Sequence, residues 1–98
     1  MYTAIRHYKM NVKSLDAETL QRVESEFIPI IQATDGFVEY HIIQPGDNEL
    51  VTVSVFETEE GAEASRVAAA GWVNDNLAHL ATEPPNVLTG EVIISARR

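Results

Sequence analysis

The segment LVTVSVFETEEGA, residues 50–62, decides how the chain folds. Apolar and polar side chains alternate through its first eight residues, which predicts a β-strand over residues 50–57. Thr58 then offers an N-cap for a helix, and Glu59 and Glu60 suit its first turn because the helix dipole favours negative charge there. The segment therefore predicts a strand that passes directly into an α-helix.

The same signals extend outward in both directions. They predict strands at residues 2–12, 37–44 and 87–96, a turn at 45–48, a helix from Ser14 or Asp16 to Ile31, and a second helix from Thr58 to about Ala81. Pro29 is expected to kink or shorten the first helix, and Pro84 and Pro85 to follow the end of the second. The order βαββαβ indicates an α+β, ferredoxin-like fold. Right-handed crossovers give one antiparallel sheet of strand order 4-1-3-2 with both helices on one face.

Composition limits the chain to a few classes of protein. Its 98 residues suffice for one domain, residues 1–98, and 45% apolar against 22% charged residues is a globular composition. The absence of cysteine excludes disulfides and thiolate metal sites. Fifteen acidic against seven basic residues, a net charge of −8, argue against nucleic acid or an anionic membrane as partner. No targeting segment and no membrane-spanning run is visible, so a cytoplasmic protein is expected.

Alternation along the strands divides their side chains between two faces of the sheet. The mostly apolar set is predicted to face the helices: Thr3, Ile5, His7, Val38, Tyr40, Ile42, Val51, Val53, Val55, Leu88, Val92 and Ile94. The other set combines a polar middle with an apolar fringe: Arg6, Tyr8, Met10, Phe37, Glu39, His41, Ile43, Thr52, Ser54, Phe56, Val87, Thr89, Glu91 and Ile93. That second face is too apolar for water, which predicts a homodimer that buries it. Arg6, His41 and Glu91 would lie in this interface, with Arg6 and Glu91 paired.

Three features resemble the dimeric α/β-barrel superfamily, in particular its antibiotic-biosynthesis-monooxygenase-like branch. They are the strand ending GFVEYH (residues 36–41), the segment TVSVFETEEGA (52–62) and Trp72 in the second helix. The resemblance covers nearly the whole chain and implies a dimer of ferredoxin-like units, each with a ligand cavity between sheet and helices. It is specific for fold and poor for reaction, because the superfamily includes monooxygenases, haem-degrading enzymes, isomerases and proteins without known activity.

One face of the second helix carries the candidate catalytic residues. Trp72, Asn76 and His79 recur at helical spacing and are predicted to line the cavity together with ligand-binding His7 and Tyr40. Asn and His can donate hydrogen bonds to a substrate oxygen, and Trp supplies an apolar wall. The resemblance implies a monooxygenase that oxidises a small aromatic or apolar molecule without metal or flavin. If large side chains fill the space between Tyr40, His7 and Trp72, this enzyme interpretation fails.

Each of these residues also has a structural interpretation, so alternatives stay open. Trp72 suits packing, Asn76 and His79 suit an exposed helix end, and the chain would then be a non-catalytic, ligand-binding or stress-associated accessory protein. An isomerase or decarboxylase would need a buried acid or histidine base. Haem-degrading relatives use Asn, Trp and His, for which Asn11, Trp72 and His79 offer the types at a poorer spacing. No histidine pair has metal-ligand spacing, and nucleotide or flavin motifs are missing, so no cofactor is expected.

Overall fold

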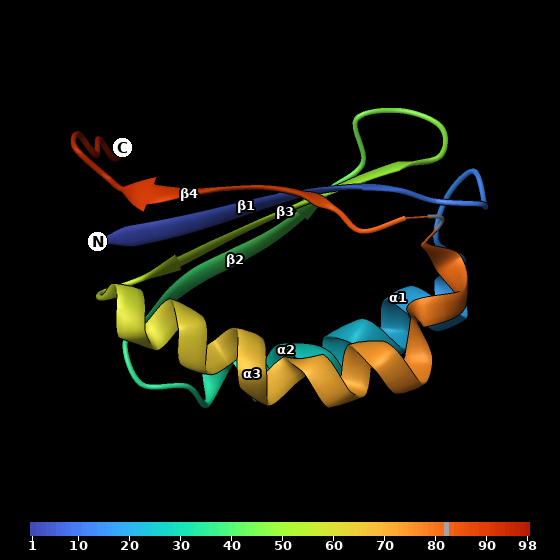
Figure 1. Ribbon diagram of the computed structural model, residues 1–98, viewed down its shortest axis with the longest axis horizontal. Helices are drawn as coiled ribbons and strands as arrows, with labels where there is room; N and C mark the ends of the chain where they lie inside the picture. Colours follow the sequence, from blue (N-terminus) through green and yellow to red (C-terminus); the bar gives the residue numbers. More distant parts are fainter. Residues whose placement is uncertain (82) are drawn as a thin grey trace.

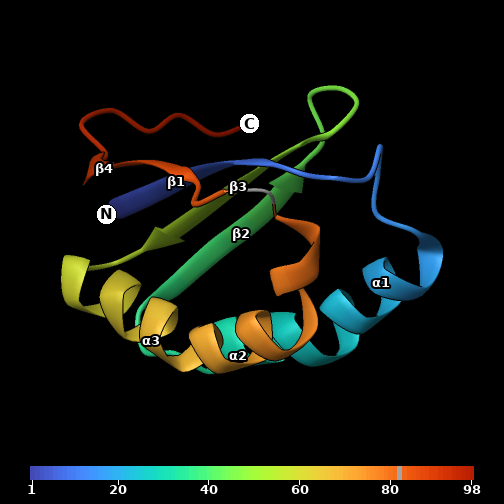
Figure 2. The ribbon, with the colours of Figure 1, turned by 45° about the vertical axis from the view of Figure 1, so that its right-hand side comes forward.

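The computed structural model describes residues 1–81 and 83–98 and has the predicted order of elements (Figure 1). The elements are, along the chain, β1 (Tyr2–Lys9), α1 (Ala17–Arg22), η1 (Val23–Phe27), α2 (Ile28–Gln32), β2 (Phe37–Ile43), β3 (Glu49–Phe56), α3 (Glu59–Asn76), η2 (Ala78–Leu80) and β4 (Asn86–Glu91). Neighbouring strands are antiparallel in the order β2-β3-β1-β4, and all helices lie on one side of the sheet (Figures 1 and 2). The predicted ferredoxin-like α+β fold is therefore confirmed.

The segment that joins β3 to α3 forms the helix N-cap that its sequence predicts. The Thr58 side chain caps α3 by accepting a hydrogen bond from Gly61 N at 3.1 Å. A Cβ on Gly61 would lie 2.8 Å from the carbonyl oxygen of Asp35, so only glycine lets α3 start this close to the loop before β2. The cap and the close approach together fix where the helix leaves the sheet.

The first helical stretch continues past Pro29 because a π-helical turn precedes the proline. Asp16 caps α1 by accepting a hydrogen bond from Thr19 N at 2.7 Å, and these bonds lower the pKa of the Asp16 carboxyl. Residues Val23–Phe27 then form a π-helical turn, in which Ile28 N donates to Val23 O, and Pro29 enters in the first turn of α2, where its missing N–H is tolerated. The predicted kink at Pro29 is thus replaced by a π-turn.

The predicted assignment of the sheet faces is wrong for most residues. Arg6 pairs with Thr52 and Ala4 with Ser54, and these positions lie under the helices. The helix face of the sheet comprises Ala4, Arg6, Tyr8, Met10, Tyr40, Ile42, Leu50, Thr52, Ser54 and Phe56. The outer face comprises Thr3, Ile5, His7, Glu39, His41, Ile43, Val51, Val53, Val55 and Leu88. The helix face therefore combines core residues with the polar Arg6, Thr52 and Ser54, and the outer face combines valines with His7, Glu39 and His41.

Strand β2 departs from strict alternation, which explains why Tyr40 and Ile42 were assigned correctly. The pairing of β2 with β3 shifts between Phe37 and Glu39, as a β-bulge at Val38 requires. Phe37 and Tyr40 consequently both pack against the core, although they are three residues apart. The bulge reverses the alternation for the rest of the strand.

Two elements, α3 and β4, end about five residues earlier than predicted, and β1 ends at Lys9 instead of residue 12. Helix α3 stops at Asn76, because Leu77 leaves helical geometry with φ −122°, and a short 3-10 helix follows. Strand β4 ends at Glu91 instead of residue 96, since the ladder with β1 finishes with a bond from Val92 N to Met1 O at 2.8 Å. Ile93 and Ile94 are 91% and 83% exposed on the C-terminal segment, which passes on the outer side of the sheet (Figure 2).

The core lies between the helices and one end of the sheet. Phe56 is fully buried among Val23, Phe27, Ile31 and Ala69. Truncating such a ring to alanine costs about 3–5 kcal/mol, so Phe56 anchors the layers. Among the described residues, no helix is long and apolar enough to cross a membrane.

Candidate functional site

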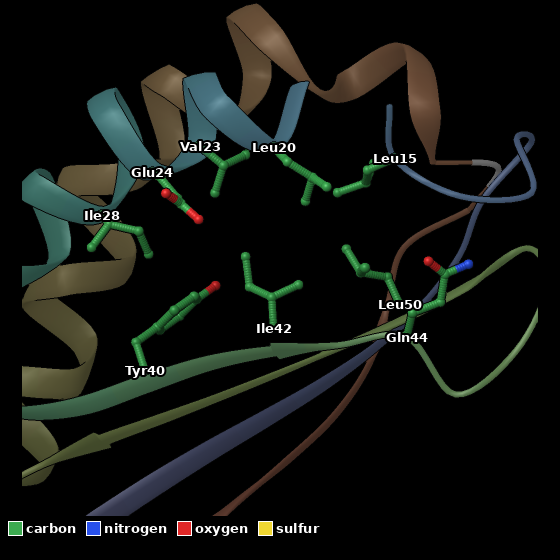
Figure 3. A pocket seen from close by; sticks show the side chains of 9 residues that line it. All are labelled: Leu15, Leu20, Val23, Glu24, Ile28, Tyr40, Ile42, Gln44 and Leu50. Carbon is green, nitrogen blue, oxygen red and sulfur yellow. The ribbon is translucent and has the colours of Figure 1, made fainter. Parts of the chain in front are cut away.

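Three adjoining hollows separate the helices from the sheet. The large hollow, about 530 Å³, lies between α3 and the middle of the sheet, and the edge hollow, about 310 Å³, lies between α1 and the end of β2 (Figure 3). A narrow hollow of about 120 Å³ shares lining residues with both. Tyr40 lines all three. Their combined size suits a small organic molecule.

The large hollow has a polar floor and a mixed roof. Its floor is the helix face of the sheet, with Arg6, Tyr8, Tyr40, Thr52 and Ser54. Its roof comes from α2, η1 and α3, with Phe27, Ile31, Ser65, Arg66, Ala69, Ala70, Val73 and Asn74. Small alanines on α3 leave the space open, because larger side chains there would reach the sheet. Such a cavity, with apolar walls and a few polar groups, is typical of a ligand site.

Arg6 is the cation of this floor. Its guanidinium is partly buried and forms no hydrogen bond or ion pair with any residue that the structure describes. Arg66, at the opposite wall, is held instead by Glu63, with N–O distances of 2.6 and 3.0 Å. The hydrogen bond from Arg66 and, to a lesser extent, the charge of Arg6 lower the pKa of the Glu63 carboxyl. Arg6 forms no ion pair with Glu63, so its guanidinium is the group of this floor that can pair with an anion.

Two tyrosines line the large hollow together with Arg6. Burial raises the pKa of Tyr40 to about 12, against a smaller opposing effect of its hydrogen bond with Thr52. Burial also raises the pKa of Tyr8, opposed by the nearby Arg6 charge. Both phenols therefore stay protonated near neutral pH and can donate hydrogen bonds to an anionic ligand atom.

The two predicted ligand-binding residues lie on opposite faces of the sheet. Tyr40 lines the hollows, but His7 pairs with Val51 on the outer face, and its Nε2 lies 2.9 Å from Glu49 Oε1. The prediction that His7 and Tyr40 share a pocket is therefore wrong. The reason is the reversed face assignment of β1.

Trp72 and Asn76 lie together, but outside the hollows. Trp72 Nε1 donates to Glu26 at 3.0 Å, its ring packs on Phe27 at 5.4 Å between centroids, and the Arg22 guanidinium lies 6.0 Å from the ring centroid. Asn76 accepts a hydrogen bond from Arg22 and donates one to Trp72 O at 2.9 Å. This interhelical cluster joins α3 to the first helical stretch, so these contacts support a structural role.

His79 does not share the helix face predicted for it. It lies beyond the end of α3, on η2, and is exposed. Its backbone carbonyl accepts a hydrogen bond from Asn11 Nδ2 at 2.8 Å, which ties η2 to the end of β1. Asn11, Trp72 and His79 thus do not form a common side-chain site.

The residues predicted for the sheet interface do not lie on one face of the sheet. His41 lies on the outer face, 3.0 Å from Glu39, whereas Arg6 lies on the helix face. Arg6 is opposite Val87 and Glu91 is opposite Tyr2, so the predicted Arg6–Glu91 pair is wrong. The Glu91 carboxylate lies 3.8 Å from the N-terminal amine instead.

Sequence reasoning missed Arg6, Tyr8, Thr52 and Ser54 as cavity residues. Their signal was present, because polar side chains at alternate positions of two neighbouring strands made a polar middle. A polar patch under helices is expected where a cavity, rather than close packing, lies above it. No group of three or more His, Cys, Asp or Glu side chains that could hold a metal occurs among the residues described.

Known structures share this fold at low sequence identity. No protein-family model matches the chain. No curated protein matches it either.

Three solved structures illustrate the likeness. A putative antibiotic biosynthesis monooxygenase from Nitrosomonas europaea is 18% identical, with TM-score 0.73 over 94% of this chain and 89% of that one. SnoaB, a cofactor-independent oxygenase from Streptomyces nogalater, is 16% identical, with TM-score 0.66 over 99% and 93%. The ActVA-Orf6 monooxygenase from Streptomyces coelicolor, in complex with nanaomycin D, is 14% identical, with TM-score 0.70 over 96% and 92%.

The chain thus has the ferredoxin-like fold of antibiotic biosynthesis monooxygenase-like proteins. The resemblance drawn from its sequence is confirmed at this level.

Proposed function

We propose that the protein binds a small aromatic molecule with an ionisable hydroxyl group in the large hollow and oxidises it with dioxygen, without metal or flavin. The observation that carries this proposal is the Arg6 guanidinium without an ion pair among the described residues, in a hollow that Tyr8 and Tyr40 also line. A phenolate oxygen seated there would gain one charge-assisted hydrogen bond and hydroxyl donors.

Stabilising the phenolate would favour the reaction because an electron-rich ring reduces dioxygen more readily than a neutral phenol. One oxygen atom of O₂ becomes a new ring carbonyl, and the other leaves as water with the hydroxyl hydrogen and one ring hydrogen. The four electrons that O₂ gains come from the substrate, which becomes a quinone. Apolar side chains from α2, η1 and α3 would hold the ring and exclude water.

Two fold neighbours support the chemical class. SnoaB is a cofactor-independent oxygenase, and ActVA-Orf6 is a monooxygenase with nanaomycin D bound. The proposal assigns to Arg6, Tyr8 and Tyr40 the binding of substrate in this chain. It leaves Trp72, Asn76 and His79 outside the reaction, since they line none of the described hollows.

A homodimer in the cytoplasm completes the proposal. The outer face, rather than the face first expected, would be the interface, with Ile43 and Leu88 47% and 73% exposed. The C-terminal segment, which carries Ile93 and Ile94, passes on the same side of the sheet (Figure 2). A second copy can cover such an apolar sheet by two-fold symmetry. A cytoplasmic location agrees with a domain that has no cysteine.

The second candidate function is ligand binding without turnover. One observation favours it: no histidine or aspartate lines the described hollows, and the only carboxylate there, Glu24, belongs to the edge hollow. A substrate would have to lose its proton to water, or already be ionised. Turnover, rather than binding, is therefore the decisive measurement.

Oxygen uptake with a panel of naphthols and anthrols tests the function. We expect uptake equimolar with quinone formation, and a kcat/KM about 10- to 100-fold lower for Arg6→Gln, since a charge-assisted bond contributes about 1.5–3 kcal/mol. Arg66→Gln is the matched control, because the Arg66 guanidinium already forms an ion pair with Glu63. Arg6-dependent binding without oxygen uptake would reject the oxygenase and leave the binding protein.

A further inference from the structure

The two ends of the connected hollows offer a ligand opposite partners. At the large hollow the charged group without an ion pair, among the lining residues that the structure describes, is the Arg6 cation. At the edge hollow the polar groups are Glu24, Gln44 and the Tyr40 hydroxyl, and the remaining lining is apolar: Leu15, Leu20, Val23, Ile28, Ile42 and Leu50 (Figure 3). The site is therefore asymmetric along its length.

Gln44 presents an acceptor to the edge hollow. Its Nε2 donates to Lys13 O at 2.6 Å and to Gly46 O at 3.2 Å, so both amide hydrogens are engaged. These two carbonyls fix the orientation of the amide, and the Oε1 atom turns toward the hollow (Figure 3). A ligand would meet a carbonyl oxygen, not an N–H.

Glu24 adds a second acceptor from η1. Its carboxylate points from the helices into the same hollow (Figure 3) and has no hydrogen bond or ion pair within residues 1–81 and 83–98. The neighbouring acid Glu26 is occupied, since Trp72 donates to it at 3.0 Å and Arg22 lies at 3.6 Å. Glu24 is thus the carboxylate left for a ligand.

The passage between the ends suits a flat apolar body. The narrow hollow shares Leu15, Val23, Tyr40, Ile42 and Leu50 with the edge hollow, and Tyr8, Phe27, Tyr40, Thr52, Val73 and Ala78 with the large one. Arg6 pairs with Thr52, which pairs with Ile42, so the backbones of Arg6 and of Ile42, which lines the edge hollow, are about 10 Å apart. That is the length of two linked or fused rings.

We propose that the site selects a bipolar ligand. An anionic oxygen sits at Arg6, an apolar ring system passes Tyr40, and a hydroxyl or amine at the far end donates to Glu24 and Gln44. This inference rests on the proposed function only in using the same cavity. It also excludes a class of ligand, because a second anionic group would meet the Glu24 carboxylate and be repelled.

Three probes of one shape test the proposal by calorimetry. They are biphenyl-4-carboxylates that carry a hydroxyl, a methoxy or a second carboxylate group at the 4′ position. We expect the hydroxyl compound to bind about tenfold more tightly than the methoxy compound, and the dicarboxylate to bind most weakly. Glu24→Ala should reduce the preference for hydroxyl, because only the Gln44 acceptor remains, and should improve dicarboxylate binding.

Two variants complete the experiment. Glu18→Ala removes an exposed carboxylate of α1 that lines none of the described hollows, and it should keep the wild-type order of affinities. Arg6→Gln should weaken the hydroxyl and methoxy compounds by the same factor, because both lose the same anchor. Glu24→Gln keeps an acceptor and should retain part of the hydroxyl preference while relieving the repulsion.

The outcomes separate this inference from the oxygenase proposal. Equal affinities of the hydroxyl and methoxy compounds in the wild type, or a preference of undiminished size in Glu24→Ala, would overturn the bipolar ligand. Naphthol oxidation could persist in that case. The predicted order of affinities together with no oxygen uptake from any phenol would instead reject the oxygenase and leave the bipolar site standing.

Discussion

The helix face of the sheet carries a polar patch beside its apolar core, and the outer face carries exposed apolar side chains. Arg6, Tyr8, Thr52 and Ser54 lie beneath helices, whereas on the other side Leu88 is 73% exposed. A sheet covered on one side usually shows the opposite distribution. The polar patch lines the large hollow, and the exposed apolar side chains of the outer face are where we propose that a second copy binds.

The largest expected effect concerns the outer face. Leu88→Glu should weaken a homodimer on the order of 100- to 1,000-fold, about 3–4 kcal/mol, because each copy would bury a carboxylate in an apolar interface. Sedimentation velocity checks this, with a wild-type mass near twice 10.9 kDa at micromolar concentration.

Val67→Glu is the matched control for that experiment. It adds the same charge at a 62% exposed position of α3, away from the outer face, and should leave the mass unchanged. A wild-type protein of monomer mass, or a dimer indifferent to Leu88→Glu, would remove the outer face from the interface.

The next effect concerns the covered face at alkaline pH. The pKa of Tyr40, about 12, lies above the ordinary value of 10.0. The folded state therefore holds this proton more tightly, and the resulting stability is complete below pH 10 and lost as pH rises toward 12. Two pH units correspond to roughly 2–3 kcal/mol of unfolding free energy.

Urea unfolding between pH 9 and 11.5 measures the loss, and Tyr40→Phe should flatten the pH dependence. Tyr2→Phe, which removes a phenol that lines none of the described hollows, should preserve it. An identical slope in Tyr40→Phe and wild type would show that the phenol is solvated rather than buried.

A smaller effect is expected at Arg6, where one substitution should change stability and ligand affinity in opposite directions. Arg6→Met removes a partly buried, unpaired charge, so the free energy of unfolding should rise by about 0.5–1 kcal/mol while affinity for phenolates falls. Urea titration and calorimetry on the same sample check both. A simultaneous loss of stability would mean that Arg6 supports the fold instead of the ligand.

The smallest effect concerns the interhelical cluster. Trp72→Phe removes the hydrogen bond to Glu26 but keeps an aromatic ring against Phe27, so unfolding should become easier by about 0.5–1 kcal/mol. Ligand affinity and oxygen uptake per folded molecule should not change. Lost turnover at unchanged stability would restore Trp72 to the catalytic role that its helical spacing first indicated.

The sequence predicted where the helices and strands lie better than it predicted which face of the sheet the helices cover. Asp16 and Thr58 cap the helices as their side chains predict, because capping is a local interaction. Alternation shows which residues share a face, but not which face the helices cover. The rule that apolar faces turn inward failed at Val51, Val53 and Val55, since the inner face lines a hollow.

The site was predicted less well because it depends on long-range geometry. Tyr40 was placed correctly only because the bulge at Val38 reversed the alternation of β2. His79 was placed on a helix face that ends three residues earlier, at Asn76. Neither a bulge nor a helix end of this kind has a strong local signal, whereas Arg6 could have been found from its position between Tyr8 and the polar middle of β3.

The π-turn at Val23–Phe27 has a consequence for insertions and deletions. It contains one residue more than an α-helix needs, so the stretch can lose a residue without breaking. Deleting Ser25 would let α1 continue straight into α2 and turn α1 by about 100° relative to α2. Glu24 and Leu20 would then swing away from the edge hollow, so a change of one codon length would alter which molecules fit while the sheet stayed as it is.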